Sequence, residues 1–310
     1  MGRRVLAIAL NTYRESVRAR ILIGMAGVAF AVAFYSILVG AFTLRNAPRV
    51  VSDLGAAAIS LFSIAVAIVI GATSLYRELE QKTVFPILAR PIRRGEYLVG
   101  KYLGTLLTLA VFIMADAGLI LQISAALGGR SLGLVLGLGA GSVALLAGAM
   151  YVWPPARTFG PIPWASVMLI VGALLAGNAP DERRVVLGAA TLTLLEVGVV
   201  TAMATLFSSF STPFLSALLT LWMVIIGREA DSLARLPVKY FGQMAHDAGA
   251  LLAKVVPNLQ IYVPPRPLLT GEAIEPRLSS YLAWAAVNGI GWAIGLLTVA
   301  TLVFRKRDFL

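Results

Sequence analysis

The stretch that decides the fold reads LGAAAISLFSIAVAIVIGATSL (54–75), YRELEQKTVFPILARPIRRGEYLVGK (76–101) and YLGTLLTLAVFIMADAGLILQISAAL (102–127). Each outer run reaches the roughly 20 mainly apolar residues that a helix needs to cross a bilayer. The middle run is dense in charge, and Arg90-Pro91 interrupts it because the residue before a proline avoids helical backbone angles. We therefore expect two membrane spans joined by a helix, a corner at Pro91 and a second helix that starts near Arg94 and continues as the third span.

The composition agrees with a membrane protein. The chain has 310 residues, of which 59% are hydrophobic and 13% are charged, whereas soluble domains carry about 25% charged residues. The net charge of +11 does not indicate nucleic acid, because the basic residues flank apolar runs and form no single soluble patch. The absence of cysteine and the single His246 exclude thiol chemistry and paired-histidine metal motifs. The apolar run from Val5 to Leu10 is too short for a signal peptide.

The sequence predicts an all-α polytopic membrane protein forming a single transmembrane domain over 1–310. An inserted apolar hairpin, 128–184, contains two further runs, 132–152 and 162–178, which are either two full spans or a re-entrant pair. The prediction is therefore six spans plus this pair, or six to eight in all. The six spans are expected at 21–43, 54–75, 102–127, 185–207, 213–227 and 281–304.

Glycine spacing suggests how the inserted pair packs. Gly133, Gly137 and Gly141 recur every four residues, a pattern that lets membrane helices approach closely. We expect these glycines to face a neighbouring helix.

Two amphipathic segments are expected outside the spans. Residues 3–20 predict an interfacial helix with Leu6, Ala9 and Tyr13 on its apolar face, the alternative being a simple flank of the first span. Loop 228–280 contains a second amphipathic pattern that ends at Pro257. That helix is expected to lie on the outer membrane surface or to fold back between spans, or else to form a packed external cap.

Lysine and arginine near the span ends predict the orientation. With the N-terminus inside, the interfacial helix, the 76–101 block, Arg157 and the closing Arg305-Lys306-Arg307 all fall on one side, and that side carries most of the basic residues of the short loops. Cytoplasmic loops are enriched in these residues, and a long loop such as 228–280 has little weight in this rule. Both termini are therefore predicted to be cytoplasmic.

The charged block resembles a known signature. Its spacing of two glutamates, a threonine, an apolar stretch, a proline, a basic pair, a glutamate and a Gly-Lys pair that opens a span is similar to that of the permease subunits of type-2 ATP-binding-cassette (ABC) transporters. The likeness is greatest to the branch that includes the permease of nitrous-oxide-reductase maturation. Lys82 stands where the family often has glycine, and Arg93 where it often has serine. The matching residues are Glu78, Glu80, Thr83, Leu88, Pro91, Arg94, Glu96, Gly100 and Lys101.

Weaker likenesses extend the resemblance over most of the chain except roughly 128–184. They are the amphipathic start, the Leu206 to Ser211 turn, Pro257-Asn258-Leu259 and the closing Phe304 to Phe309. The resemblance implies an exporter of the bacterial cytoplasmic (inner) membrane, in which segment 76–100 couples the permease to a cytoplasmic ATPase. It also implies that helix 3–20 slides along the membrane and that 228–280 gates the outer exit.

The resemblance implies partners that this chain does not encode. No G-x-x-x-x-G-K-[ST] motif occurs, so ATP and Mg²⁺ would bind to two copies of a separate ABC ATPase, and this chain would hold no cofactor and would not itself be an enzyme. A second permease subunit, identical or different, and membrane lipid complete the expected assembly. The substrate is not indicated. The residues expected to couple the ATPase to the spans are Arg77, Glu78, Glu80, Thr83, Pro91, Arg93, Arg94, Glu96 and Lys101.

Two acidic residues lie midway along predicted spans and form a candidate intramembrane polar pathway. Asp116 is in the third span and Glu196 is in segment 185–207. A charge at a helix centre costs about 2.5–3.5 kcal/mol on insertion scales, so such residues usually face a protein interior or a water path. Each is predicted either to contact substrate or an ion, or to make an interhelical hydrogen bond as a protonated or paired carboxyl.

Three other function classes compete with an exporter permease. A stand-alone secondary transporter is disfavoured because no inverted repeat or cluster of intramembrane ionisable groups is evident in the sequence. An intramembrane enzyme is disfavoured because the sequence has no cysteine, no metal-ligand cluster and no serine–histidine pair in the predicted spans. A membrane anchor that assembles soluble partners without transport would carry the same docking block.

Overall fold

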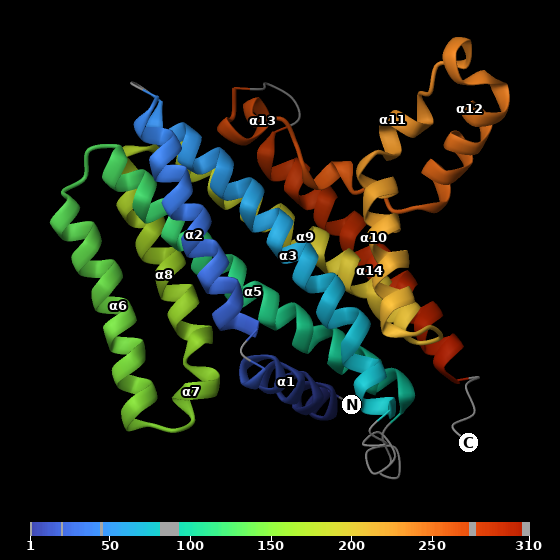
Figure 1. Cartoon of the computed structure of the whole chain (residues 1–310), viewed down its shortest axis with the longest axis horizontal. Coiled ribbons are helices and arrows are strands. Elements are labelled where there is room, and N and C mark those ends of the chain that lie inside the picture. Colours follow the sequence, from blue (N-terminus) through green and yellow to red (C-terminus); the bar gives the residue numbers. More distant parts are fainter. Residues whose placement is uncertain (1, 20, 44–45, 81–92, 273–276, 306–310) are drawn as a thin grey trace.

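The computed structural model describes residues 2–19, 21–43, 46–80, 93–272 and 277–305, and in these ranges the regular structure is entirely helical (Figure 1). Seven helical segments are long and apolar enough to cross a membrane. The chain is therefore a multi-pass α-helical membrane protein, as predicted. The helices that contain these segments are α2 (Ile21–Ala41), α3 (Ala47–Glu80), α5 (Arg94–Leu127), α6 (Leu132–Val152), α8 (Pro161–Leu175, extended by the short helix η1, Ala176–Asn178), α9 (Pro180–Ser208) and α14 (Leu278–Arg305).

The two helices of the inserted pair are long enough to cross a membrane, whereas the helix at the predicted span 213–227 is shorter. Both α6 and the combined α8–η1 segment have the length and composition of a span, which favours two spans over a re-entrant pair. Helix α10 (Pro213–Arg228) has 16 residues and is about 24 Å long, short of the roughly 30 Å hydrocarbon core. It reaches only part of the way across a bilayer because it ends at Arg228.

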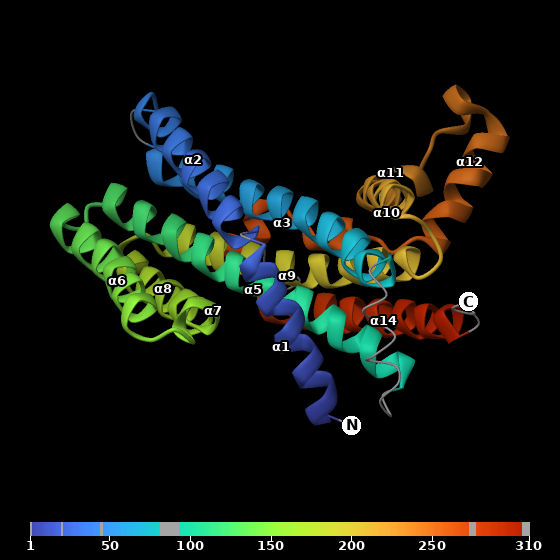
Figure 2. The same cartoon turned by 60° about the horizontal axis from the view of Figure 1, so that its bottom comes forward.

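Helix α9 forms the centre of the bundle, with α3, α5 and α14 packed around it (Figures 1 and 2). Small residues bring these helices close together. A Cβ atom added to Gly71 of α3 would lie 2.5 Å from the Cβ of Ala204 in α9. On the other flank of α5, a Cβ at Gly118 would lie 2.6 Å from the Met168 carbonyl of α8, and one at Gly172 would lie 2.6 Å from the Gly118 carbonyl oxygen. These contacts fix the core helices relative to one another.

The glycine prediction for the inserted pair was wrong in its location. No atom lies within 4 Å of the position that a Cβ would take at Gly133, Gly137 or Gly141. In the described chain these glycines therefore face away from the neighbouring helices. The close approach of this region occurs instead between α5 and α8, through Gly118 and Gly172, and α6 lies at the edge of the bundle (Figure 1).

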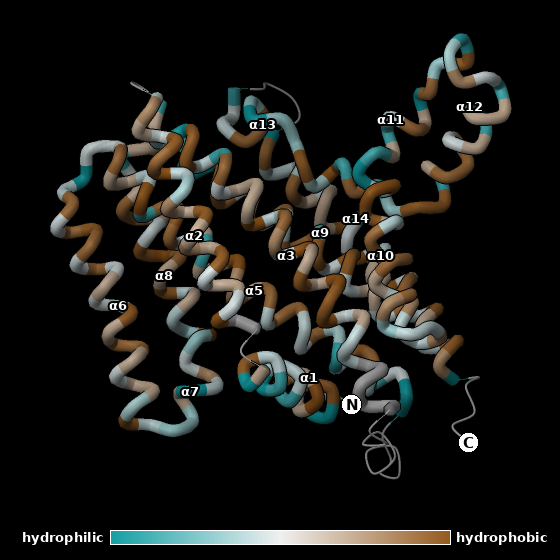
Figure 3. Tube along the Cα trace, viewed as in Figure 1, coloured by the Kyte–Doolittle hydropathy of each residue, from teal (hydrophilic) through white to brown (hydrophobic). Residues whose placement is uncertain are grey.

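The amphipathic helix expected over 3–20 is α1 (Gly2–Arg18). It crosses α5, and the hydropathy trace shows polar and apolar residues alternating along it (Figure 3). Gly100 and Gly104 allow this crossing, since a Cβ at Gly104 would lie 2.4 Å from the Ala9 carbonyl oxygen. Ala9 and Tyr13 of the predicted apolar face are buried, whereas Leu6 is exposed. Part of the apolar face of α1 is therefore packed inside the protein, and part of it is exposed.

The 228–280 region contains the predicted amphipathic helix, α12 (Val238–Val255), which bends at Gly242, where φ is +79°. It packs against α11 (Ala230–Ala234) and projects from the bundle, so it does not fold back between spans (Figure 1). The segment after it does return. Leu259 is fully buried and donates its backbone N–H to the Gly227 carbonyl at 2.9 Å, and the short helices η2 (Gln260–Tyr262) and α13 (Arg266–Thr270) follow.

The two ends of the bundle differ in their elements. Helix α1, the short α7 (Ala156–Phe159), the last turn of α3, the start of α5 and the end of α14 gather at one end, and α11, α12 and α13 lie at the other (Figure 1). This grouping agrees with the predicted sides of the membrane. We call them the basic end and the outer end, and which of them faces the cytoplasm stays a prediction.

Candidate functional site

The charged block joins two helices that are longer than a bilayer requires. Helices α3 and α5 each have 34 residues, or about 50 Å, so both extend beyond a hydrocarbon core of about 30 Å. The start of α5 at Arg94 confirms the predicted beginning of the second helix. Thr83 and Pro91 lie outside the described residues, so the corner stays a prediction. Arg77, Glu78 and Glu80 lie in the last turns of α3, where the backbone alone is described.

The first turn of α5 is held by Glu96 and Arg94. The buried carboxylate of Glu96 accepts a hydrogen bond from the backbone N–H of Arg93 at 3.1 Å, which satisfies one of the amides that a helix start leaves unpaired. The Arg94 guanidinium donates to the carbonyl oxygens of Phe304 and Arg305 at 3.0 and 2.9 Å. Arg94 therefore joins the start of α5 to the end of α14, where a cation is favoured by the helix dipole.

Lys101 joins α5 to α3. Its buried ammonium donates to both the carbonyl oxygen and the hydroxyl of Ser74, each at 2.9 Å, and lies 5.6 Å from the centre of the Tyr97 ring. Together with the Gly100–Gly104 crossing of α1, these contacts connect the start of α5 to α1, α3 and α14. The structure brings together four of the nine predicted coupling residues, Arg93, Arg94, Glu96 and Lys101. All four lie in or beside the first turns of α5.

A second polar cluster lies within the membrane part of the bundle. Glu196 of α9 is fully buried, and Arg228 at the end of α10 donates to both of its carboxylate oxygens, at 2.9 and 3.0 Å. The Ser60 hydroxyl of α3 receives a third hydrogen bond from Arg228 at 2.6 Å and donates to Glu196 at 3.4 Å. This forked geometry is the strong form of an ion pair. Of the two predicted states for Glu196, the structure shows the paired carboxyl.

The cluster lies beside a cleft of about 280 Å³, which we call the outer cleft. Ser60, Thr193 and Arg228 line its inner part, and Asp53 and Arg266 line its outer part. Arg228 is therefore the contact between the buried Glu196 and a cavity that reaches the outer end. Apolar side chains such as Ala56, Val185 and Leu269 complete the lining of the outer cleft.

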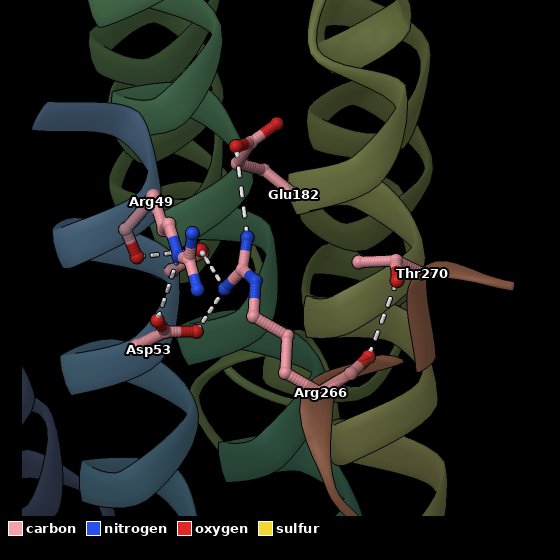
Figure 4. A network of polar contacts seen from close by, with 6 residues as sticks. Arg49, Asp53, Glu182, Arg266 and Thr270 are labelled. Carbon is pink, nitrogen blue, oxygen red and sulfur yellow. Dashed lines mark hydrogen bonds and ion pairs between the residues drawn. The ribbon is translucent and has the colours of Figure 1, made fainter. Parts of the chain in front are cut away.

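The mouth of the outer cleft is a network of charges (Figure 4). Arg266 of α13 contacts Asp53 of α3 and lies 3.7 Å from Glu182 at the start of α9, so one guanidinium joins three elements. Arg49 lies 3.9 Å from the other Asp53 oxygen. In addition, the Arg184 guanidinium of α9 donates to the Thr270 carbonyl of α13 at 2.9 Å. Helix α13 is thus attached to α3 and α9 by polar contacts that water and salt can reach.

Tyr262 closes one wall of the outer cleft. Burial, with smaller contributions from the nearby Glu196 and Tyr281, raises the pKa of Tyr262 to about 12. Its hydroxyl is therefore neutral at neutral pH, and it donates to the Asn288 side-chain oxygen of α14 at 3.4 Å. The returning segment is thereby attached to α14 as well as to α10.

Asp116 occupies a different environment. It is buried in α5, its Oδ2 atom has no hydrogen-bond partner among the described residues, and it does not line the outer cleft. The structure does not bring it together with Glu196. A substrate- or ion-contacting role for either residue stays a prediction.

Sequence reasoning missed Arg228, Asp53, Glu182 and Arg266. Their charges were visible, but Asp53, Glu182 and Arg228 lie beside predicted span ends and Arg266 lies in the 228–280 loop, and a charge is ordinary in both places.

The structure thus shows two polar clusters, one at the start of α5 and one beside the outer cleft. Among the described residues, no group of three His, Cys, Asp or Glu side chains is positioned to hold a metal ion. Comparison of the sequence with models of protein families and with curated proteins finds no match in either case. The class of the molecule therefore rests on its helices, and its function is a proposal.

Proposed function

We propose that this chain is the membrane-spanning permease subunit of an ATP-binding-cassette exporter. It would couple ATP hydrolysis by two copies of a separate cytoplasmic ATPase to the movement of a substrate across the bacterial cytoplasmic membrane. A second permease subunit, identical or different, would complete the assembly. The ATPase would bind ATP and Mg²⁺, and the basic end would face the cytoplasm.

The observation that carries the proposal is the mechanical continuity of α5. The helix starts within the charged block at Arg94 and runs without a break to Leu127. Its first turns are attached to α14 through Arg94, to α3 through Lys101 and to α1 at Gly104. A force applied to residues 76–96 would therefore move α5 together with three other helices, because a helix and its packed contacts move as a rigid unit.

The outer cleft supports transport over a purely anchoring role. An anchor has no need of a cavity that extends from the outer end to Arg228, the partner of a buried carboxylate. The polar contacts of Arg266 close the mouth of the outer cleft by attaching α13 to α3 and α9. Tilting α3 or α9 would strain these contacts and open a route outward, which fits the gate that the resemblance assigns to 228–280.

The experiment is co-purification of the tagged chain with the ATPase from native membranes, followed by ATP turnover in liposomes. Charge reversal by Glu78→Lys with Glu80→Lys should abolish ATPase recovery and the stimulated turnover. Glu229→Lys with Glu272→Lys makes the same change in charge at exposed positions of the outer loop and should leave both measurements unchanged. Full recovery of the ATPase by the first variant would disprove the coupling assignment.

A stand-alone secondary transporter is the second candidate. The observation that favours it is the Glu196–Arg228 pair beside the outer cleft, because intramembrane ionisable groups mark substrate and ion pathways. Vesicles that contain the purified chain alone separate the two functions. Uptake driven by an ion gradient without any ATPase would support the second candidate and exclude the first.

A further inference from the structure

A cavity that runs along the bundle joins a second cavity at the basic end, and together they form one groove. The first, of about 520 Å³, is lined by apolar side chains of α5, α9 and α14, such as Leu103, Leu194 and Ile294. The second, of about 780 Å³, lies at the start of α5 and the end of α14 and is closed on one side by Val5 of α1. Val99 and Thr301 line both cavities. An apolar groove therefore continues directly into a polar pocket.

The polar pocket is positively charged. The described charged residues that line it are Arg93, Arg94, Arg305 and Glu96. The Glu96 carboxylate accepts a hydrogen bond from the Arg93 backbone N–H, and Arg94 donates to the end of α14. The guanidinium groups of Arg93 and Arg305 are on exposed residues. Three guanidinium groups against one carboxylate give a net positive pocket at the rim of the apolar groove.

We propose that this composite groove binds one anionic phospholipid, with the phosphate in the Arg93–Arg305 pocket and an acyl chain along the apolar groove between α5, α9 and α14. Basic pockets between membrane helices on the cytoplasmic side bind acidic headgroups, and guanidinium groups suit phosphate oxygens. A free phosphate would use only the polar pocket. The apolar continuation past Thr301 is what assigns the site to a lipid.

The bound lipid would lie against the first turns of α5. The headgroup would contact the helix start that Arg94 and Lys101 brace, and the acyl chain would pass Tyr102 and Gly198 in the apolar groove. Lipid binding at this groove does not require a bound ATPase. The proposal can therefore be tested with the purified permease chain alone. Failure of the coupling proposal would leave this result unaffected.

The experiment is native mass spectrometry of the purified chain titrated with phosphatidylglycerol or phosphatidylcholine. Wild type should retain one phosphatidylglycerol per chain and should bind phosphatidylcholine much more weakly. Arg93→Gln with Arg305→Gln should weaken phosphatidylglycerol binding about twenty-five-fold, because each arginine near an anionic surface contributes about fivefold. Arg14→Gln with Arg18→Gln removes the same charge from exposed positions of α1 and should leave this tight site unchanged.

A second pair of variants tests the apolar groove without changing charge. Thr301→Trp places a ring where the two cavities meet and should abolish the tight site. Leu302→Trp adds the same ring at an exposed neighbouring residue that lines neither cavity and should preserve it. Size-exclusion profiles check folding, and if the double arginine variant is misfolded the tryptophan pair decides the result.

Four results would overturn the proposal. The first is equal retention of phosphatidylcholine, and the second is wild-type retention of phosphatidylglycerol in the folded Thr301→Trp variant. The third is displacement of the lipid by millimolar inorganic phosphate, which would reduce the site to an anion pocket. The fourth is a change of oligomeric state in Thr301→Trp but not in Leu302→Trp, which would assign the groove to a second protein chain.

Discussion

Replacing Arg228 alone should destabilise the protein more than replacing Arg228 and Glu196 together. In the native structure two hydrogen bonds, at 2.9 and 3.0 Å, join the guanidinium to a carboxylate that has no solvent exposure. Arg228→Leu leaves that carboxylate enclosed with only the Ser60 hydroxyl nearby. Leaving one member of a buried ion pair without its partner costs about 3–5 kcal/mol.

Replacing Glu196 alone should cost less than replacing Arg228 alone, because the Arg228 side chain is the more exposed of the two. The Arg228 side chain is 32% exposed and that of Glu196 is 0% exposed, so Glu196→Leu leaves a cation that water in the outer cleft can still reach. We expect a cost of about 1–3 kcal/mol for the lost charged hydrogen bonds. The double leucine variant replaces both charges with apolar groups and should lie within about 1 kcal/mol of wild type. The coupling energy is then at least about 3 kcal/mol.

The assay is a double-mutant cycle of unfolding free energies, measured by SDS titration in mixed micelles. Single-variant values that add to within about 0.5 kcal/mol of the double-variant value would refute the reasoning. The same variants separate the two roles considered for Glu196. If the pair is structural, the folded double variant should transport at the wild-type rate. If Glu196 contacts the substrate or an ion, the other role predicted from the sequence, transport is lost although stability is retained.

Three further predictions follow from the packing and the pKa values. Gly118→Val should cost about 1–3 kcal/mol of unfolding free energy because its side chain meets the Met168 backbone, whereas Gly137→Val, placed in open space, should cost much less in the same titration. Burial raises the pKa of Tyr13 from 10.0 to about 12, so the unfolded state loses this proton first and stability falls as the pH rises from about 10 to 12. Tyr13→Phe should remove that part of the alkaline decline, and an unchanged pH profile would contradict the assignment. Asp116→Asn should reduce transport less than Glu196→Gln, because Glu196 is hydrogen-bonded to Arg228, which lines the outer cleft, whereas Asp116 neither lines the cleft nor has a hydrogen-bond partner for its Oδ2 atom among the described residues. The opposite ranking would contradict the proposed path.

The membrane fold was predictable because hydropathy and length act locally. The long runs of α3 and α5, the amphipathic pattern of α1 and the pattern that became α12 are each properties of consecutive residues. The shortness of 213–227 was likewise visible in the sequence. Its consequence was not visible, because nothing in the local pattern places Arg228 at the depth of Glu196.

Pairing between distant segments was the part that the sequence could not supply. The glycine repeat in α6 predicted a close helix contact, but every helix has several faces, and the structure places that contact at Gly118 and Gly172. The Asp53–Arg266 contact joins residues more than 200 positions apart. Such pairs depend on how the helices assemble, and single-sequence periodicity carries no information on it.

The most direct test of the central proposal uses the absence of cysteine from the chain. Single substitutions Glu80→Cys and Glu272→Cys place one thiol at the charged block and one at an exposed outer position. Each variant is treated in native membranes with a short thiol-to-amine cross-linker, and the products are probed for the ATPase by photolabelling with an azido-ATP analogue. We predict a nucleotide-labelled cross-linked product for Glu80→Cys and none for Glu272→Cys. Absence of that product from Glu80→Cys, or equal products from both variants, would contradict this prediction.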